Sequence, residues 1–391
     1  MSSSKLVIHL DVNGTIMPAD PIKSKHVRSM LNIHLSKQAF VKEDAHGEIV
    51  WWNGIPFHRG EKPPLLPQFR YSRHIREHYN EEAEHMCHES VPIEDFRNAV
   101  YGGSGCDDFT DQSQPGHVYH TELLNLMDLL EWRFTDVDEE ITEAFTLPVI
   151  DDKRRMSLFV PSFLALIRHL AIDESRDFVF VIRTFGSDIP RMIPAFNLIA
   201  EGKHPLLPKP GCILPPSWVG SLCRRGRSDH RLVLSPPQNS SQTSIIDGNA
   251  NILSFFDSLP SRSVIMINDD YEDWKSHSWN PVFGKPVFLD LENACMHFLF
   301  DDNVNMNPKD SIAAVWLKKN DNTGAPHFVP LPLHTRAGLA TIGTVLLQAN
   351  LFKSITDENA FISELKRAEK RYCSLKERMH SESSSFTSSH S

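Results

Sequence analysis

Four short apolar runs, each ending in polar or acidic residues, restrict the folds open to this chain. Residues 5–11 read Lys-Leu-Val-Ile-His-Leu-Asp, and similar runs occupy 178–183, 263–268 and 297–300. Apolar runs of this length, bounded by turn residues, are typical of buried strands in a parallel sheet. A fifth, weaker run lies at 312–317. We therefore expect a parallel sheet whose strands end in polar side chains.

Helical periodicity lies between these runs. Residues 157–172 and 245–259 repeat apolar side chains at helical spacing, each segment just before a predicted strand. Strands that alternate with helices predict βαβ units, a parallel sheet and right-handed crossovers. The predicted fold class is α/β with a Rossmann-like parallel sheet, and ligands of such sheets bind at the carboxyl ends of the strands.

The chain also carries a long insertion after the first predicted strand. Roughly 130 residues precede the helix that leads to the second strand, far more than a crossover needs. We expect an α/β core from residues 1–15 and 151–350, and an inserted subdomain from 16–150. A C-terminal helix is expected at 351–373, and the Ser-rich residues 374–391 are expected to be disordered.

Composition excludes several classes of protein. The chain has 391 residues, with 40 Lys and Arg against 50 Asp and Glu and a net charge of −10. This balance is ordinary for a globular protein and excludes collagen-like, coiled-coil and wholly disordered chains. A net acidic chain is a poor general nucleic-acid binder, because binding to phosphates needs a basic field. No apolar stretch approaches the length of a membrane-spanning helix, so we expect no membrane partner.

The spacing of the cysteines indicates the redox environment of the chain. They form no Cys-x-x-Cys pair and have no regular spacing, and no apolar signal segment can be placed near residue 1. We therefore expect free thiols in a reducing, cytoplasmic environment. The six residues are Cys87, Cys106, Cys212, Cys223, Cys295 and Cys373.

Side chains with complementary chemistry follow the predicted strands. Asp11 can attack an electrophile such as a phosphoryl group and form an acyl phosphate. The hydroxyl of Thr184 can hold a phosphoryl oxygen, and a lysine can neutralise charge on the nucleophile and the phosphate. Asp301 and Asp302, together with Asp11, can chelate Mg²⁺, which prefers oxygen ligands. In phosphoryl transfer, positioning and electrostatics do most of the catalytic work.

This order of residues resembles the haloacid dehalogenase (HAD) superfamily. The resemblance covers 5–15, 178–188 and 297–302, together with a lysine between the last two segments. It implies a sheet of strand order 5-4-1-2-3, a cap inserted after the first strand, an aspartyl nucleophile and bound Mg²⁺. Most such proteins are phosphatases, so the resemblance implies a small phosphorylated substrate. The oligomeric state is left open.

The resemblance also assigns individual residues. Asp11 matches the nucleophile, Asp301 and Asp302 match the acidic pair that binds metal, and Thr184 with Gly186 matches the phosphate-binding segment. Two lysines are candidates for the remaining position: Lys285, in Gly-Lys-Pro, and Lys275, in Trp-Lys.

Asn13 departs from the family pattern. Phosphatases of the family carry a second Asp two residues after the nucleophile, where it acts as general acid and base. The backbone carbonyl of Asn13 is still a possible metal ligand, but its amide cannot transfer a proton. General acid–base catalysis contributes roughly 10²–10⁴-fold to a rate. A His or Glu of the insertion is one possible replacement.

Two functions therefore stay open. The first is a Mg²⁺-dependent hydrolase in which Asp11 attacks a phosphoryl group, and less favourably a carbon centre. The second is a HAD-like binding or scaffold protein that keeps the pocket without turnover. A nucleotide-binding oxidoreductase is disfavoured, because no Gly-x-Gly-x-x-Gly follows any predicted strand.

Other motifs have two interpretations each. The His-rich residues 72–89 resemble a metal-ligand face, but a solvated amphipathic helix is more common. The Gly-rich residues 102–105 lack a following Lys-Ser or Lys-Thr and are expected to be a flexible loop. The basic residues 224–227 are expected in a solvated loop, with polyanion binding as the alternative. The aromatic residues 51–57 line either a pocket or a small core.

The acidic doublet Asp269-Asp270 has two interpretations as well. It ends the third predicted strand, so it either supplements the acidic site or caps the helix that follows.

Overall fold

The structure is a computed structural model. It describes residues 4–21, 24–57, 60–62, 94–95, 99, 105–148, 154–173, 176–226, 228–237, 242–304, 311–320 and 326–387. The chain divides into two compact units. The first comprises Met1–Met17, Trp132–Pro148 and Ser157–Ser391, and the second comprises Pro18–Glu131 and Val149–Met156.

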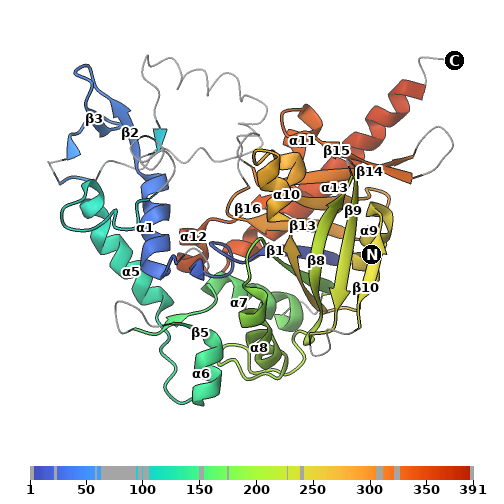
Figure 1. Ribbon diagram of the computed structural model, residues 1–391, viewed down its shortest axis with the longest axis horizontal. Coiled ribbons are helices and arrows are strands. Elements are labelled where there is room, and N and C mark those ends of the chain that lie inside the picture. Colours follow the sequence, from blue (N-terminus) through green and yellow to red (C-terminus); the bar gives the residue numbers. More distant parts are fainter. Residues whose placement is uncertain are drawn as a thin grey trace. The chain divides into compact units, whose positions relative to one another are not determined.

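The first unit is built on an eight-stranded sheet (Figure 1). Its order is β10 (Ser244–Asp247), β9 (Asp229–Ser235), β8 (Pro216–Arg225), β11 (Val264–Asp269), β7 (Phe178–Thr184), β1 (Leu6–Asp11), β13 (Met296–Asp301) and β16 (Leu346–Gln348). The strands from β8 to β16 are parallel, and β9 and β10 add an antiparallel edge. The expected α/β class with a mostly parallel sheet is confirmed.

The central position of β1 explains its composition. All six residues of Leu6–Asp11 are buried, because β7 and β13 flank the strand and both sheet faces are covered. Leu10 pairs with Phe300 on one side and Ile182 on the other. The next residue of each strand therefore lies at the same edge of the sheet, which brings Asp11 level with Asp301.

Helices cover both faces of this sheet. The helix α9 (Asn249–Ser258) packs on the face that presents Val7, Val179 and Ile265. On the other face, ring contacts of about 6 Å join α7 (Pro161–Arg168) and α8 (Ile189–Ala200) to each other and to β7. The helix α13 (Ala360–Thr387) contacts β13 on this same face through Tyr372 and Phe298.

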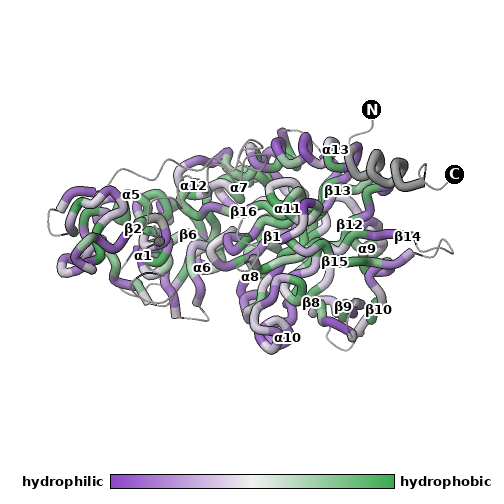
Figure 2. Tube along the Cα trace, turned by 90° about the horizontal axis from the view of Figure 1, so that it is seen from above, coloured by the Kyte–Doolittle hydropathy of each residue, from purple (hydrophilic) through white to green (hydrophobic). Residues whose placement is uncertain are grey.

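Hydropathy follows this arrangement. Figure 2 shows hydrophobic residues gathered along the central strands, whereas α13 alternates hydrophilic and hydrophobic residues. Within the part of the chain that the structure describes, none of the helices has the length and apolar character that a membrane crossing requires.

The fifth predicted strand belongs to a different sheet. Residues 312–317 fall largely in β14 (Ala313–Asn320), which lies between β12 (Lys285–Leu289) and β15 (Pro326–Leu331) in a separate three-stranded sheet. The edge of the main sheet is instead β16, whose three residues are too few to stand out by pattern. An apolar run predicts a buried strand but does not determine its neighbours.

The segment before the third strand is also corrected. Residues 245–247 form part of β10 rather than the first turn of a helix, and α9 begins at Asn249. Ile245 and Ile246 are β-branched and pair with Val233 and Leu232 of β9. Residues 202–242 include the long β8–β9 hairpin.

The C-terminal region differs from the expectation. Residues 351–373 are divided between α12 (Leu351–Thr356) and α13, with Asp357 at the end of α12. The helix α13 also continues through most of residues 374–391, where we expected disorder. Extending an existing helix costs far less than starting one, and the stretch after Ser374 contains Lys, Glu, Arg and Met, which are good helix formers.

The remaining short elements belong to the first unit, except that β6 begins at Met156, the last residue of the second unit. They are α6 (Glu139–Phe145), β5 (Thr146–Leu147), β6 (Met156–Ser157), a π-helical turn (His169–Asp173), α10 (Tyr271–Ser276), a 3₁₀ turn (Pro281–Phe283) and α11 (Arg336–Thr341). Residues 132–148, expected within the insertion, cluster with the first unit. Hydrogen bonds explain this, because Thr146 O accepts from Arg191 and Phe145 O accepts from the backbone N–H of Leu158.

The second unit has its own small core. Its elements are α1 (Val27–Gln38), β2 (Phe40–Glu43), β3 (Ile49–Trp51), β4 (Glu94–Asp95), a 3₁₀ turn (Pro115–Tyr119) and α5 (His120–Leu130). Trp51 is fully buried, with its ring 4.5 Å from Phe57 and 6.1 Å from Tyr119. The aromatic residues 51–57 therefore contribute to a core, as one of their two interpretations predicted.

Candidate functional site

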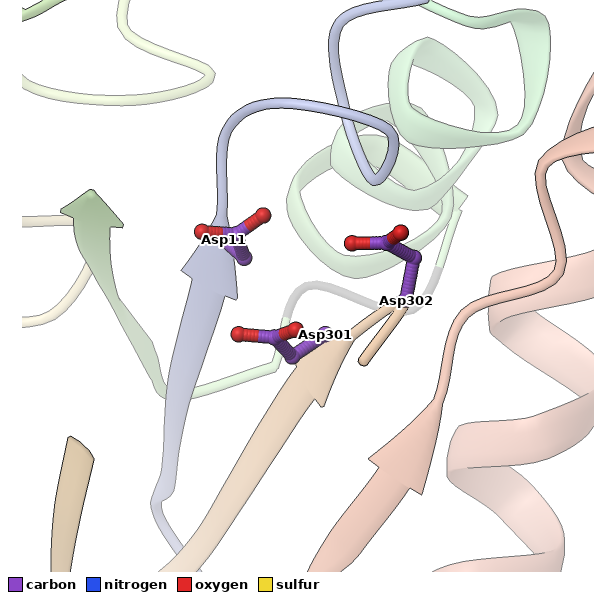
Figure 3. Close-up of side chains that lie close together, drawn as sticks. All are labelled: Asp11, Asp301 and Asp302. Carbon is purple, nitrogen blue, oxygen red and sulfur yellow. The ribbon is translucent and has the colours of Figure 1, made fainter. Parts of the chain in front are cut away.

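Three carboxylates meet at the carboxyl edge of the main sheet (Figure 3). Asp11 ends β1, Asp301 ends β13 and Asp302 follows it. Each residue offers one oxygen within 4.8 Å of the others. Asp301 is fully buried and Asp11 is 7% exposed, so these charges are largely removed from water. The structure thus brings together the three acidic residues that the sequence singled out for metal binding.

Lys285 enters this cluster from the second sheet. Its side chain is fully buried, and Nζ donates to Asp11 Oδ1 and, at 2.7 Å, to Asp301 Oδ2. Lys275, the alternative lysine, is exposed on α10, where Nζ lies 6.0 Å from the ring centre of Tyr271. Of the two candidates, the structure brings Lys285 to the carboxylates.

The charges of the cluster influence one another. Burial would lower the pKa of Lys285, but the carboxylates of Asp11 and Asp301 outweigh it and raise that pKa above its usual range. Burial raises the pKa of Asp11, Lys285 opposes this, and the charges of Asp301 and Asp302 add to it. Lys285 is therefore held as an ammonium ion among carboxylates that repel one another.

The donor set fits a hard divalent cation. Carboxylate oxygens are the ligands that Mg²⁺ prefers, and three of them face one ammonium group here. When all three are ionised, the group keeps an excess of negative charge at a largely buried position, which a divalent cation would balance. Asp11, Asp301 and Asp302 are the residues that would hold it. The backbone carbonyl of Asn13 stays a predicted ligand.

A residue of the turn after β1 forms hydrogen bonds with two of the three aspartates. Thr15 is fully buried, and its Oγ1 accepts from the backbone N–H of Asp302 at 3.0 Å and donates to Asp11 Oδ2 at 3.4 Å. Sequence reasoning did not assign Thr15 a role. A hydroxyl four residues after Asp11 has no distinctive signal, because its partner lies 287 positions away in the chain.

Thr184 lies at the end of β7, the neighbour of β1. Its Oγ1 donates to Asp188 Oδ2 at 2.8 Å and accepts from the backbone N–H of Gly186 at 2.8 Å. Asn13 Nδ2 donates to the same Asp188 oxygen at 2.9 Å. Asp188 therefore joins Asn13, in the turn after β1, to Thr184 at the end of β7, and no sequence pattern singled it out. An Asp just before a helix is usually interpreted as a cap, but Asp188 makes no side-chain capping hydrogen bond.

A buried ion pair supports the position of Lys285. Arg183 and Asp269 are both about 1% exposed in their side chains and form a two-pronged pair between β7 and β11. Arg183 Nη1 also donates to the carbonyl oxygen of Pro286 at 2.7 Å. Asp269 thus serves this ion pair, while Asp270 accepts from the N–H of Asp273 and caps α10.

An aromatic group borders the lysine. The ring centre of Phe185 lies 5.2 Å from Lys285 Nζ, and the ring stacks on Trp274 at 5.0 Å with an angle of 3° between the planes. Tyr271 meets both rings edge-on. These half-buried side chains form an apolar wall beside the ammonium group.

The remaining motifs fall outside this site. Arg224 and Arg225 lie in β8 rather than in a loop, because both residues pair with β9. Their side chains form ion pairs with Asp273 and Asp247. The His-rich residues 72–89 and most of the Gly-rich loop lie outside the described residues. Among the residues that are described, the three aspartates are the one group with the spacing of a metal site.

Comparison with known proteins returned no relative. No family model, no curated protein and no solved structure matches this chain. Any functional conclusion therefore rests on the residues and their geometry.

Proposed function

We propose that this chain is a HAD-like, Mg²⁺-dependent hydrolase that transfers a phosphoryl group from a small molecule to Asp11 and then to water. The observation that carries the proposal is the convergence of Asp11, Lys285, Asp301 and Asp302 at one edge of the sheet, with Thr184 on the adjacent strand. These residues come from four segments of the chain. The sequence singled out the three aspartates and Thr184, and it left Lys285 and Lys275 as alternatives.

Each side chain has a role in this reaction. A carboxylate oxygen of Asp11 attacks phosphorus, the bond from phosphorus to the leaving oxygen breaks, and an aspartyl phosphate forms. The Lys285 ammonium stabilises charge on the phosphoryl oxygens. The Thr184 hydroxyl donates its proton to Asp188 and so positions that carboxylate. Bound Mg²⁺ would neutralise charge that spreads over these oxygens in the transition state. Gly186 supplies a backbone N–H that holds the Thr184 hydroxyl in place.

The strand order supports the proposal as well. When β8 is set aside because it opens the antiparallel hairpin, the neighbouring parallel strands are β16, β13, β1, β7 and β11. Numbered along the chain, they run 5-4-1-2-3, the order that the HAD resemblance implies. The second unit begins at Pro18, directly after the turn that follows β1, where the resemblance places a cap.

The first test is hydrolysis of p-nitrophenyl phosphate by the full chain with Mg²⁺. We expect turnover that is lost with a chelator, and a loss of at least roughly 10³-fold in Asp11→Asn, because the amide is not a nucleophile. Lys275→Ala is the matched control, since this lysine is exposed and away from the cluster. Activity that survives Asp11→Asn would refute the assignment of Asp11 as nucleophile.

The second candidate function is binding without turnover, and Asn13 is the observation that favours it. Its amide donates a hydrogen bond to Asp188, but an amide is too weakly acidic to transfer a proton to a leaving group. This alternative predicts an inert wild type, Mg²⁺ binding by calorimetry, and activity gained in Asn13→Asp. A wild type that hydrolyses the aryl phosphate through Asp11 excludes it.

A further inference from the structure

We infer that Asp188 is the general base that this chain uses in place of an acidic residue at position 13. The inference rests on the proposed function, and it concerns the second half of the reaction, in which water removes the phosphoryl group from Asp11. Three observations lead to it: the shared carboxylate oxygen, the unpartnered oxygen of Asn13, and the position of Asp188 before α8.

The first observation is that one oxygen of Asp188 holds two site residues. Oδ2 accepts from Thr184 Oγ1 at 2.8 Å and from Asn13 Nδ2 at 2.9 Å. Both partners are donors, which suits an ionised carboxylate. The other oxygen, Oδ1, takes part in neither bond. Asp188 is 5% exposed, so its orientation is set by the protein rather than by solvent.

The second observation concerns the amide of Asn13. Because Nδ2 faces the carboxylate of Asp188, Oδ1 of Asn13 is left as an acceptor. This oxygen is buried and has no hydrogen-bond partner among the described residues. A buried acceptor without a donor is costly, so the site is suited to a bound group that carries hydrogen atoms. Water is the smallest such group and the one that the second half-reaction needs.

The third observation is the place of Asp188 in the fold. It is the residue just before α8, a helix of 12 residues that follows β7, the neighbour of β1. Of its two partners, Asn13 lies in the turn after β1 and Thr184 ends β7. The carboxylate of Asp188 therefore lies at the same edge of the sheet as Asp11.

Hydrolysis of the aspartyl phosphate needs only these groups and one water molecule. A water donates one hydrogen bond to Asn13 Oδ1 and the other to Asp188 Oδ1, so that its oxygen lone pair faces phosphorus. The water O–H bond towards Asp188 breaks and the proton passes to the carboxylate. The water oxygen bonds to phosphorus, and the bond between phosphorus and Asp11 breaks. Inorganic phosphate leaves, and Asp188 releases its proton to solvent.

The experiment separates the two half-reactions. p-Nitrophenyl phosphate has a good leaving group, so phosphorylation of Asp11 needs no acid. We expect Asp188→Asn to release close to one equivalent of p-nitrophenol in a rapid-quench burst and then to slow by roughly 10²–10⁴-fold against wild type. Phosphorylated Asp11 accumulates, and mass spectrometry after hydroxylamine treatment detects it. Asp188→Glu restores part of the steady rate.

Matched variants exclude a purely structural role. Ser187→Ala alters an exposed side chain of the same loop and is expected to leave both the burst and the steady rate unchanged. A thermal melt checks that Asp188→Asn stays folded. A folded Asp188→Asn that keeps the wild-type steady rate, or that loses its burst together with its turnover, overturns the inference.

Failure of the proposed function has a different signature. In that case no variant forms phosphorylated Asp11, and wild type and Asp11→Asn hydrolyse the substrate equally. A wild type that is inert while Asn13→Asp is active also overturns the base assignment, because Asp188 is present in both.

Discussion

At the residue scale, Gly14 shows how closely the backbone approaches the acidic cluster. Its φ of +77° lies in the region that favours glycine, and a Cβ at this position would stand 3.1 Å from Cγ and Oδ2 of Asp302. The Asn-Gly dipeptide is a common turn, so the sequence alone does not separate a turn from a site. This turn therefore favours glycine for two reasons: the positive φ and the short distance to Asp302.

Gly14→Ala is expected to destabilise the chain and weaken Mg²⁺ binding. Positive φ costs about 1–2 kcal/mol for a residue with a Cβ, and the contact with Asp302 displaces a predicted ligand. Urea unfolding and calorimetric titration with Mg²⁺ measure the two effects.

The matched control is Gly54→Ala. Gly54 has a φ of +83° but nothing within 4 Å of its Cβ position, so it carries the backbone cost without the contact. Equal Mg²⁺ affinity in the two variants would contradict a role of Gly14 in placing Asp302.

At the element scale, Lys285 reaches the cluster because two sheets are tied together. The lysine begins β12, which belongs to the three-stranded sheet, whereas its carboxylate partners end strands of the main sheet. Arg183 of β7 links the two sheets by donating to the carbonyl oxygen of Pro286 in β12, and its ion pair with Asp269 of β11 holds it in place within the main sheet. Neither Arg183 nor the carbonyl of Pro286 stands out in the sequence, because the interactions of Arg183 join segments that are far apart in the chain.

Arg183→Met is expected to cost about 3–5 kcal/mol in the free energy of unfolding, since it leaves the buried carboxylate of Asp269 without its partner. The double variant Arg183→Met/Asp269→Leu is expected to be more stable than the single variant, because no unpaired charge is left. Urea unfolding provides both values.

Arg231→Met is the control for loss of an ion pair. Its pair with Asp247 is about 40% exposed on each side, so we expect a much smaller change in the free energy of unfolding than for Arg183→Met. A similar loss of unfolding free energy in Arg183→Met and Arg231→Met would show that the buried Arg183–Asp269 pair contributes little to stability.

At the scale of the whole molecule, His204 anchors the segment 132–148 to the first unit. The ring is 2% exposed and lies within 5.8 Å of Trp132 and 4.5 Å of Phe145. Its Nδ1 accepts from the backbone N–H of Leu206 at 3.1 Å, which requires the neutral form of that nitrogen. This aromatic surrounding explains why the segment clusters with the core rather than with the insertion.

The stability of the first unit is expected to fall between pH 6.5 and pH 4 because of His204. Burial lowers its pKa to about 4, so the unfolded chain binds a proton in this range and the folded chain does not. Since protonation then favours unfolding, the contribution of His204 is present above pH 6.5 and is lost as the pH falls. The loss is on the order of 3 kcal/mol.

Urea unfolding from pH 7 to pH 4 tests this prediction in wild type and His204→Asn. Asn keeps an acceptor near the N–H of Leu206 but does not titrate, so its stability should change less with pH. Parallel pH profiles for the two proteins would show that His204 does not carry the effect.

The sequence by itself determined the class of fold and the residues with reactive chemistry. Buried strands and amphipathic helices are local patterns, and parallel strands place their carboxyl ends at one edge, which is why Asp11, Asp301 and Asp302 were predicted to meet. Only the tertiary structure decided between Lys285 and Lys275, assigned residues 312–317 to a second sheet, and placed Asp188 between Asn13 and Thr184. These three placements depend on contacts between segments far apart in the chain, and the local periodicity of a sequence does not indicate which distant segments meet.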